Sequence, residues 1–219
     1  MQNELFTKNG FELSPKEYEL FEKYLTLFLE YNQHTNLSAI RDEAWIIEKH
    51  FVDSLYGANI IQEYFSSGDR GVWWVWNTSA IKLLDIGSGG WFPGIALKIV
   101  IPELEVTLLD SVGKKVKAMN YFVEQLWLKN IFALQERAEL LAKNQNHAGK
   151  YDFVVSRATA YITDILPWAL PFLKPDGKII LYKMPSEDEM KDLKKIVKKL
   201  WLHFSEFEYE IQDNKRILF

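Results

Sequence analysis

The chain has 219 residues, of which 48% are hydrophobic and 26% are charged, and it carries a formal net charge of −4 with no cysteine. This length suits one α/β domain with a small appendage, which buries a core without crosslinks. The absence of cysteine excludes disulfides, thiolate metal sites and cysteine nucleophiles. No apolar run approaches the ~18 residues of a membrane span, and the start lacks a secretion-signal pattern. We therefore expect a cytoplasmic protein with no membrane association, and we take it to be a monomer.

Residues 1–65 are predicted to form a helical cap. The segment Ser14-Pro15-Lys16-Glu17 combines a capping residue, a proline at the first helical position and a glutamate three residues after the cap. Apolar residues then recur at helical spacing, which indicates one buried face. A second helical stretch is expected from about 42 to 64. Residues 66–80, rich in Ser, Gly, Asp and Asn, are predicted to be a loop that joins the cap to the rest.

Residues 81–219 show short apolar runs that alternate with helical patterns, which favours a mostly parallel sheet covered on both faces. Two further apolar runs flank Gln212-Asp213-Asn214, which predicts an antiparallel hairpin at the end of the chain. The expected strands are 82–86, 106–109, 132–134, 153–155 and 178–182, with the hairpin at 204–211 and 215–219. Helices are expected near 93–101, 113–126, 161–173 and 187–202.

A glycine-rich loop follows the first predicted strand, in LLDIGSGGWFPG at 83–94. Glycines there allow a sharp turn and close approach to a ligand, and the next helix offers free N–H groups. The dinucleotide fingerprint requires a third glycine at 92, where the chain has Phe92, so NAD is disfavoured. Asp110 ends the second strand 23 residues after Gly87, where a carboxylate can accept both ribose hydroxyls. Together these features favour S-adenosylmethionine.

Seven segments in the same order resemble one family, the bacterial 16S rRNA (guanine-N7)-methyltransferase G family, also called the glucose-inhibited division protein B family. They are NLSAIRD at 36–42, HFVDSL at 50–55, DIGSGGWFPG at 85–94, LLDSVGKK at 108–115, RAE at 137–139, SRA at 156–158 and YK at 182–183. The resemblance implies a class I S-adenosylmethionine-dependent methyltransferase fold, Rossmann-like, with a mostly parallel seven-stranded sheet and a C-terminal antiparallel hairpin. It also implies methylation of N7 of a guanine in the helix-18 loop of 16S rRNA.

The cofactor contacts that the resemblance implies are Gly87, Phe92, Ala138, Glu139 and Arg157, and Asp110 joins them on the spacing argument. Guanine N7 already carries a lone pair, so the reaction needs alignment and a dry pocket more than a general base. No acid–base pair is evident, and only Arg157 and Lys183 are candidates for positioning. The four histidines are too scattered in sequence to predict a metal site.

A net charge of −4 requires local basic groups for RNA binding, because contacts to phosphate provide much of the affinity. Lysines at the start of the predicted helix 113–126 gain nothing from the helix dipole, which favours a ligand role. We expect Arg157 to face the cleft. His50 and Asp53 share a helix face and either pair with each other or contact the sheet, although RNA contact by His50 stays open. The predicted RNA contacts are Arg41, His50, Lys114, Lys115 and Lys183.

Two alternatives remain open. A small-molecule methyltransferase on the same fold would transfer the methyl group without RNA. The second alternative is an RNA-binding remnant with an impaired cofactor loop, which would bind no cofactor. The reason to consider it is Trp91, which stands where the family has glycine. Several of the eight tryptophans occupy positions that suit glycine, in loops or at helix ends. Our hypothesis is that these are UGA codons from a lineage that reads UGA as glycine; the positions are Trp73, Trp74, Trp76, Trp91, Trp127 and Trp201.

Overall fold

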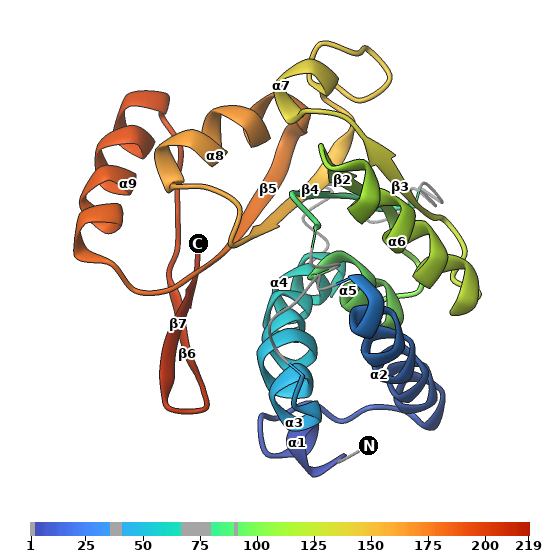
Figure 1. The fold of residues 1–219 in the computed structure, drawn as a ribbon. Helices are drawn as coiled ribbons and strands as arrows, with labels where there is room; N and C mark the ends of the chain where they lie inside the picture. Colours follow the sequence, from blue (N-terminus) through green and yellow to red (C-terminus); the bar gives the residue numbers. More distant parts are fainter. Residues whose placement is uncertain (1–2, 36–40, 67–79, 90–91) are drawn as a thin grey trace.

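The computed structural model describes residues 3–35, 41–66, 80–89 and 92–219. Within these residues the strands form one seven-stranded sheet in the order β3-β2-β1-β4-β5-β7-β6 (Figure 1). The first five are parallel, and β7 is antiparallel to both of its neighbours. The predicted sheet with a C-terminal hairpin is therefore confirmed. The strands are β1 (Lys82–Ile86), β2 (Glu105–Asp110), β3 (Ile131–Gln135), β4 (Tyr151–Arg157), β5 (Leu173–Lys183), β6 (Phe207–Ile211) and β7 (Asn214–Leu218).

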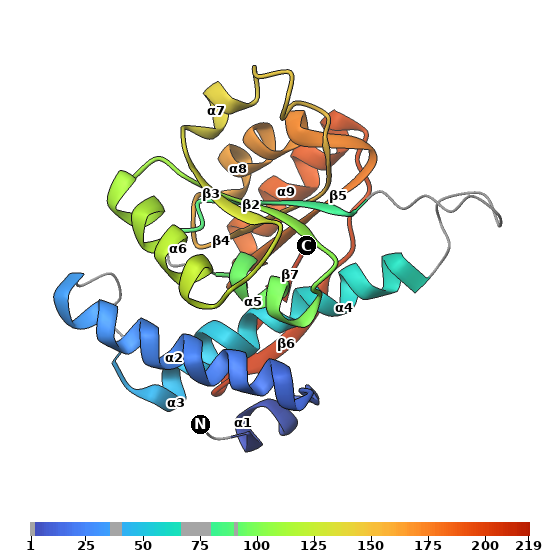
Figure 2. The same cartoon turned by 90° about the vertical axis from the view of Figure 1, so that its right-hand side faces the viewer.

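Helices cover both faces of the sheet (Figure 2). One face carries α2, α4, α5 and α6, and the other carries α7, α8 and α9. The bounds in the described residues are α1 (Glu4–Thr7), α2 (Pro15–Thr35), α3 (Glu43–Ile46), α4 (Asp53–Ser66), α5 (Gly94–Val100), α6 (Gly113–Gln125), α7 (Ala138–Leu141), α8 (Ile162–Ala169) and α9 (Glu187–Leu200). A π-helical turn, η1 (Ile47–Val52), joins α3 to α4, and a 3₁₀ turn, η2 (Leu170–Phe172), follows α8.

The alternation of side chains along the strands divides the core into two layers. In β1, Leu83 packs with the N-terminal helices, whereas the next residue, Leu84, packs with α8 and α9. Both side chains are fully buried. Because residues of the cap such as Phe21 and Phe51 belong to the same cluster as Leu83, the cap and the sheet share one core.

The predicted helix start at Ser14 is confirmed in detail. Its backbone N–H donates to Glu17 Oε2 at 2.7 Å, and the Glu17 N–H donates back to Ser14 Oγ at 3.4 Å. The sequence predicted neither α1 nor α7, because a four-residue helix is too short to show a periodic pattern. It also predicted one regular helix from 42 to 64, where the chain has the π-helical turn. The predicted join at 66–80 lies almost entirely outside the described residues.

Two helices end in left-handed residues that are tryptophans. Trp127 follows α6 with φ of 54°, and Trp201 follows α9 with φ of 56°. In each case the next residue closes the cap, since Leu128 N–H donates to Val123 O and Leu202 N–H donates to Val197 O. This is the cap geometry in which glycine is preferred. Trp73, Trp74, Trp76 and Trp91 lie outside the described residues.

Candidate cofactor and RNA site

The glycine loop starts at the carboxyl end of β1. Gly87 has φ of 72°, and the N–H groups of Gly87 and Ser88 both donate to Leu109 O on the neighbouring strand. A Cβ added to Gly87 would lie 2.4 Å from the Thr159 side chain, and one added to Gly94 would lie 2.4 Å from Leu108. The loop therefore requires glycine both for its conformation and for its close packing.

Asp85 lies beneath this loop and is fully buried. Its Oδ2 accepts a hydrogen bond of 2.8 Å from the N–H of Gly94, at the start of α5. Its Oδ1 has no hydrogen-bond partner among the described residues. Burial raises the pKa of the Asp85 carboxyl to about 7, although the bond from Gly94 and the charge of Arg157 oppose the rise. The unsatisfied oxygen leaves one strong acceptor at the edge where a ligand is expected.

Asp110 ends β2 directly beside the loop, as the sequence predicted. Its Oδ1 accepts from the N–H of Val112 at 2.8 Å, so this oxygen is held by the start of α6. Its Oδ2 lies 3.7 Å from the ammonium of Lys115, and the Lys115 side chain runs across Gly89. The carboxylate is thus oriented toward the glycine loop, with one oxygen fixed by backbone and the other paired with a movable cation.

Phe92, His50 and Arg157 stack on one another at the end of the glycine loop. The His50 ring lies 4.7 Å from the Phe92 ring at an interplanar angle of 15°. The Arg157 guanidinium lies over the Phe92 ring, 5.0 Å from its centre. Burial, followed by the charge of Arg157, lowers the pKa of His50 to about 3, so its imidazole is neutral at pH 7.

Arg157 points into the N-terminal cap, and the expectation that it faces the cleft is wrong. Its Nη1 donates to Asp53 Oδ2 at 3.0 Å and to Lys49 O at 3.1 Å. Only 13% of its side chain is exposed. The cause is the cap: the π-helical turn η1 presents the carbonyls of Lys49 and His50 to the guanidinium, and the first residue of α4 presents the Asp53 carboxylate. His50 and Asp53 each contact Arg157, which confirms the alternative that they contact the sheet. The predicted cofactor contact of Arg157 stays a prediction.

Asp53 is the centre of a buried polar cluster that the sequence pattern did not reveal. Its other oxygen, Oδ1, accepts a hydrogen bond of 2.8 Å from the hydroxyl of Tyr209 on β6. Arg216 on β7 lies 3.9 Å from the same oxygen. These partners are more than 150 residues from Asp53 in sequence, so no local spacing could have identified them. The motif at 50–55 was the only sequence feature that pointed to Asp53, and it did not indicate which residues would contact it.

Ala138 and Glu139 lie at the same edge, just after β3. Ala138 is buried at the start of α7, and the Glu139 carboxylate is partly exposed, 3.5 Å from Arg137. The position is compatible with a contact to the far end of a ligand that extends across β1 and β2. The proposed roles of Ala138 and Glu139 stay predictions.

The predicted RNA-binding cations other than Lys115, which pairs with Asp110, fall into two groups. Lys183 is largely buried and ion-paired, since its ammonium lies 2.6 Å from Glu189 Oε1 and donates to Ala160 O. Glu189 lies three residues after Ser186, the N-cap of α9, and its N–H donates to Ser186 Oγ, but its carboxylate binds Lys183 and the N–H of Ile162 rather than closing a capping box. Lys114 is exposed on the first turn of α6, and Arg41 is exposed just before α3. Their contact with RNA stays a prediction.

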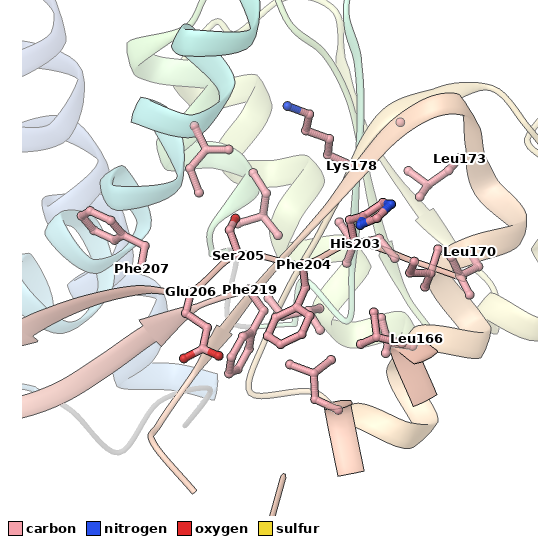
Figure 3. A pocket seen from close by; sticks show the side chains of 18 of the residues that line it. Leu166, Leu170, Leu173, Lys178, His203, Phe204, Ser205, Glu206, Phe207 and Phe219 are labelled. Carbon is pink, nitrogen blue, oxygen red and sulfur yellow. The ribbon is translucent and has the colours of Figure 1, made fainter. Parts of the chain in front are cut away.

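A cavity of about 760 Å³ lies elsewhere, beside β5 and between α8, α9 and the segment 202–207. Figure 3 shows an apolar lining that includes Leu166, Leu170 and Phe204, with Lys178 and Glu206 as the charged side chains labelled there. None of the predicted site residues lines it. Size alone does not make it the ligand site, because the buried carboxylate, the glycine turns and the N-terminus of α5 converge at the other location.

None of the described helices has both the length and the apolar character that crossing a membrane requires. Across the same residues, no three His, Cys, Asp or Glu side chains gather closely enough to hold a metal ion.

Comparison with known proteins identifies the family. The sequence profile of the rRNA small subunit methyltransferase G (GidB) family matches residues 17–214. The chain belongs to this family. It is 34% identical over 207 residues to ribosomal RNA small subunit methyltransferase G of Lactococcus lactis subsp. lactis (strain IL1403), with 94% of this chain and 82% of the relative covered.

Solved structures of other proteins share the fold at low sequence identity. A putative O-methyltransferase from Klebsiella pneumoniae matches with a TM-score of 0.60 and 14% identity, covering 99% of this chain and 93% of the other. A SAM-dependent methyltransferase from Aquifex aeolicus matches with a TM-score of 0.52 and 17% identity, covering 75% and 89%. The fold is therefore that of class I methyltransferases, as the sequence predicted.

Proposed function

We propose that this protein transfers the methyl group of S-adenosylmethionine to N7 of a guanine in the helix-18 loop of bacterial 16S rRNA. The observation that carries the proposal is the carboxyl edge of β1 and β2. There a buried acidic strand end, a glycine loop and Asp110 converge in a member of the methyltransferase G family. We further propose that the protein acts as a cytoplasmic monomer and needs no metal.

The residues at this edge fit the cofactor. The glycine loop allows close backbone approach, and the unpaired Oδ1 of Asp85 is a free acceptor for a polar hydrogen. Asp110 Oδ2 is placed to accept the ribose hydroxyls. Ala138 and Glu139 would bracket the adenine beyond β2. The cofactor supplies an electrophilic methyl group, and the protein has only to align it with an existing lone pair on guanine N7.

The neighbouring residues would keep the site dry and rigid. Phe92 is almost fully buried, and it contacts both the neutral ring of His50 and the guanidinium of Arg157, which also lie against each other. Because guanine N7 needs no deprotonation, the proposed reaction requires no general base. Arg157 would act by holding Phe92 and the cap against the glycine loop.

The decisive assay uses two versions of the same 16S rRNA transcript with purified protein and labelled cofactor. One contains guanine, and the other contains 7-deazaguanine, which lacks the N7 lone pair. We expect methyl transfer to the first and none to the second, with mass mapping locating the product in the helix-18 loop. Transfer to the 7-deaza transcript would refute N7 as the acceptor. Transfer to a small acceptor without RNA would instead establish the small-molecule alternative.

A variant of Asp110, compared with a control variant, tests whether this carboxylate binds the cofactor ribose. Asp110→Ala should weaken binding of S-adenosylhomocysteine by at least tenfold, because hydrogen bonds to a charged group contribute about 1.5–3 kcal/mol. Asp192→Ala on α9 is the matched control, since its carboxylate pairs with the exposed Lys195 and accepts from Tyr161, not from the glycine loop. Unchanged affinity in the Asp110 variant would contradict the ribose assignment. No measurable binding by the unmodified chain would favour the remnant with an impaired loop.

A further inference from the structure

Lys115 occupies an unusual position for a basic side chain. It lies in the first turn of α6, which contains no acidic residue, so the helix dipole disfavours its charge there. Its ammonium is directed back toward the glycine loop, 3.7 Å from Asp110 Oδ2. A Cβ on Gly89 would lie 2.4 Å from this ammonium, which places it directly over the loop backbone. A lysine that only improved solubility would extend away from the protein.

The ammonium and a ribose would compete for the same oxygen. Asp110 has one oxygen engaged by the Val112 N–H, so Oδ2 is the oxygen available for a ligand. The Asp110 side chain is 6% exposed, which leaves little room for a second partner beside Lys115. The Lys115 side chain is 36% exposed and has a flexible four-carbon stem, so it can leave without rearranging the helix.

We propose that Lys115 couples the two binding sites: its ammonium pairs with Asp110 until the cofactor ribose takes that carboxylate, and it then binds an rRNA phosphate. This inference rests on the proposed function, since it needs both a ribose ligand at Asp110 and an RNA substrate. Cofactor and RNA each favour the released lysine, so each strengthens the binding of the other. Such coupling is reciprocal by thermodynamic necessity. The protein would thereby bind rRNA best when it is loaded with cofactor.

The expected size of the coupling follows from the exposure of the pair. A partly exposed ion pair contributes up to about 1 kcal/mol, which corresponds to about a fivefold change in a dissociation constant. We therefore expect saturating S-adenosylhomocysteine to tighten the binding of 16S rRNA about fivefold in the unmodified protein. The coupling should weaken in high salt, because both interactions of Lys115 are electrostatic.

The test compares Lys115→Met with Lys114→Met in the full chain. Lys114 is exposed on the same turn, and among the described residues Asp110 has its ion pair with Lys115 rather than with Lys114. Replacing Lys114 therefore removes an equal charge without touching the pair. S-adenosylhomocysteine binding is measured by calorimetry without RNA. Binding of 16S rRNA is measured with and without saturating S-adenosylhomocysteine.

We expect Lys115→Met to bind S-adenosylhomocysteine about fivefold more tightly, to bind RNA alone as the unmodified protein does, and to lose the coupling. Lys114→Met should weaken RNA binding equally with and without the cofactor product and should keep the coupling. Weaker S-adenosylhomocysteine binding by Lys115→Met, or unchanged coupling, would overturn the inference while leaving the proposed function intact. Failure of the unmodified protein to bind either ligand would overturn the proposed function and the inference with it.

Discussion

Replacing Trp127 and Trp201 by glycine should stabilise the protein. Both residues are left-handed, with φ of 54° and 56°, and this conformation costs a residue with a Cβ roughly 1–2 kcal/mol. Glycine removes that cost but loses about 0.5–1 kcal/mol through the greater freedom of the unfolded chain. The two indole side chains are 83% and 91% exposed, so little packing is lost. The expected net gain is about 0.5–1 kcal/mol at each site.

The gains should add, because the two sites lie at the ends of different helices. The double variant should therefore gain about 1–2 kcal/mol, and at about 2–4 °C per kcal/mol for a chain of this size its Tm should rise by several degrees. Urea denaturation and thermal unfolding measure both quantities. Alanine at the same two positions is the matched control, since it removes the indole but keeps the Cβ.

Relief of left-handed backbone strain explains a gain in stability only if glycine at 127 and 201 stabilises the protein and alanine at the same positions does not. Equal effects of glycine and alanine would assign the change to loss of the exposed rings, and a loss of stability with glycine would refute the reasoning. Trp168, inside α8 and partly buried against the core, gives the opposite expectation: glycine there should destabilise by at least about 2 kcal/mol. The gene sequence separately tests the hypothesis that these tryptophans are UGA codons read as glycine in the source lineage. The hypothesis fails if the codons at 73, 74, 76, 91 and 127 are UGG.

Three further predictions concern the site. The sequence predicts that an indole at 91, where the family has glycine, obstructs the approach of the cofactor, so Trp91→Gly should tighten S-adenosylhomocysteine binding in calorimetry by about tenfold, equivalent to about 1.4 kcal/mol; unchanged affinity would show that the side chain is tolerated. Asp53→Asn should lower the free energy of unfolding in urea by about 3 kcal/mol, because it leaves the Arg157 charge buried without its partner, whereas the exposed Asp192→Asn should cost under about 1 kcal/mol. The pKa of His50 is about 3 in the folded protein, whereas a histidine in the unfolded chain has a pKa of about 6.5. Between these two values the unfolded chain binds more protons, so stability falls as the pH drops through this window. His50→Gln should therefore lose less stability between pH 7 and pH 4 than the unmodified chain, and an identical pH dependence would contradict a buried neutral imidazole.

The elements whose signals are local could be predicted from the sequence. The capping box at Ser14, the glycine turn at Gly87 and the placement of Asp110 at the end of β2 each depend on residues close in the chain, and the structure has all three. The start of β5 was predicted at 178, but it begins at Leu173, before Pro175 and Gly177. Proline and glycine are typical of turns, so the sequence pattern did not predict a strand there. The segment is extended because it pairs with β4.

The electrostatics of the site could not be predicted, because the carboxylates that pair with Arg157, Lys183 and Lys115 are set by the fold. Arg157 pairs with Asp53 from 104 residues away, and Lys183 takes a carboxylate that the local pattern assigned to a helix cap. Lys115 pairs with Asp110 because its side chain runs back across Gly89 instead of extending into solvent. Sequence spacing showed that these cations gather at one edge, but not which of them are already neutralised there.

The Asp53 cluster explains why the cap and the C-terminal hairpin belong to the site although neither contains the glycine loop. Asp53 on α4 binds Arg157 at the end of β4 through one oxygen, and it binds Tyr209 on β6 through the other. Arg157 in turn lies over Phe92 at the loop. Each buried charge needs its partner, so displacement of the cap or of the hairpin would leave Arg157 or Asp53 unsatisfied. The side chain of Phe92 is therefore connected through Arg157 and Asp53 to both the N-terminal cap and the C-terminal hairpin.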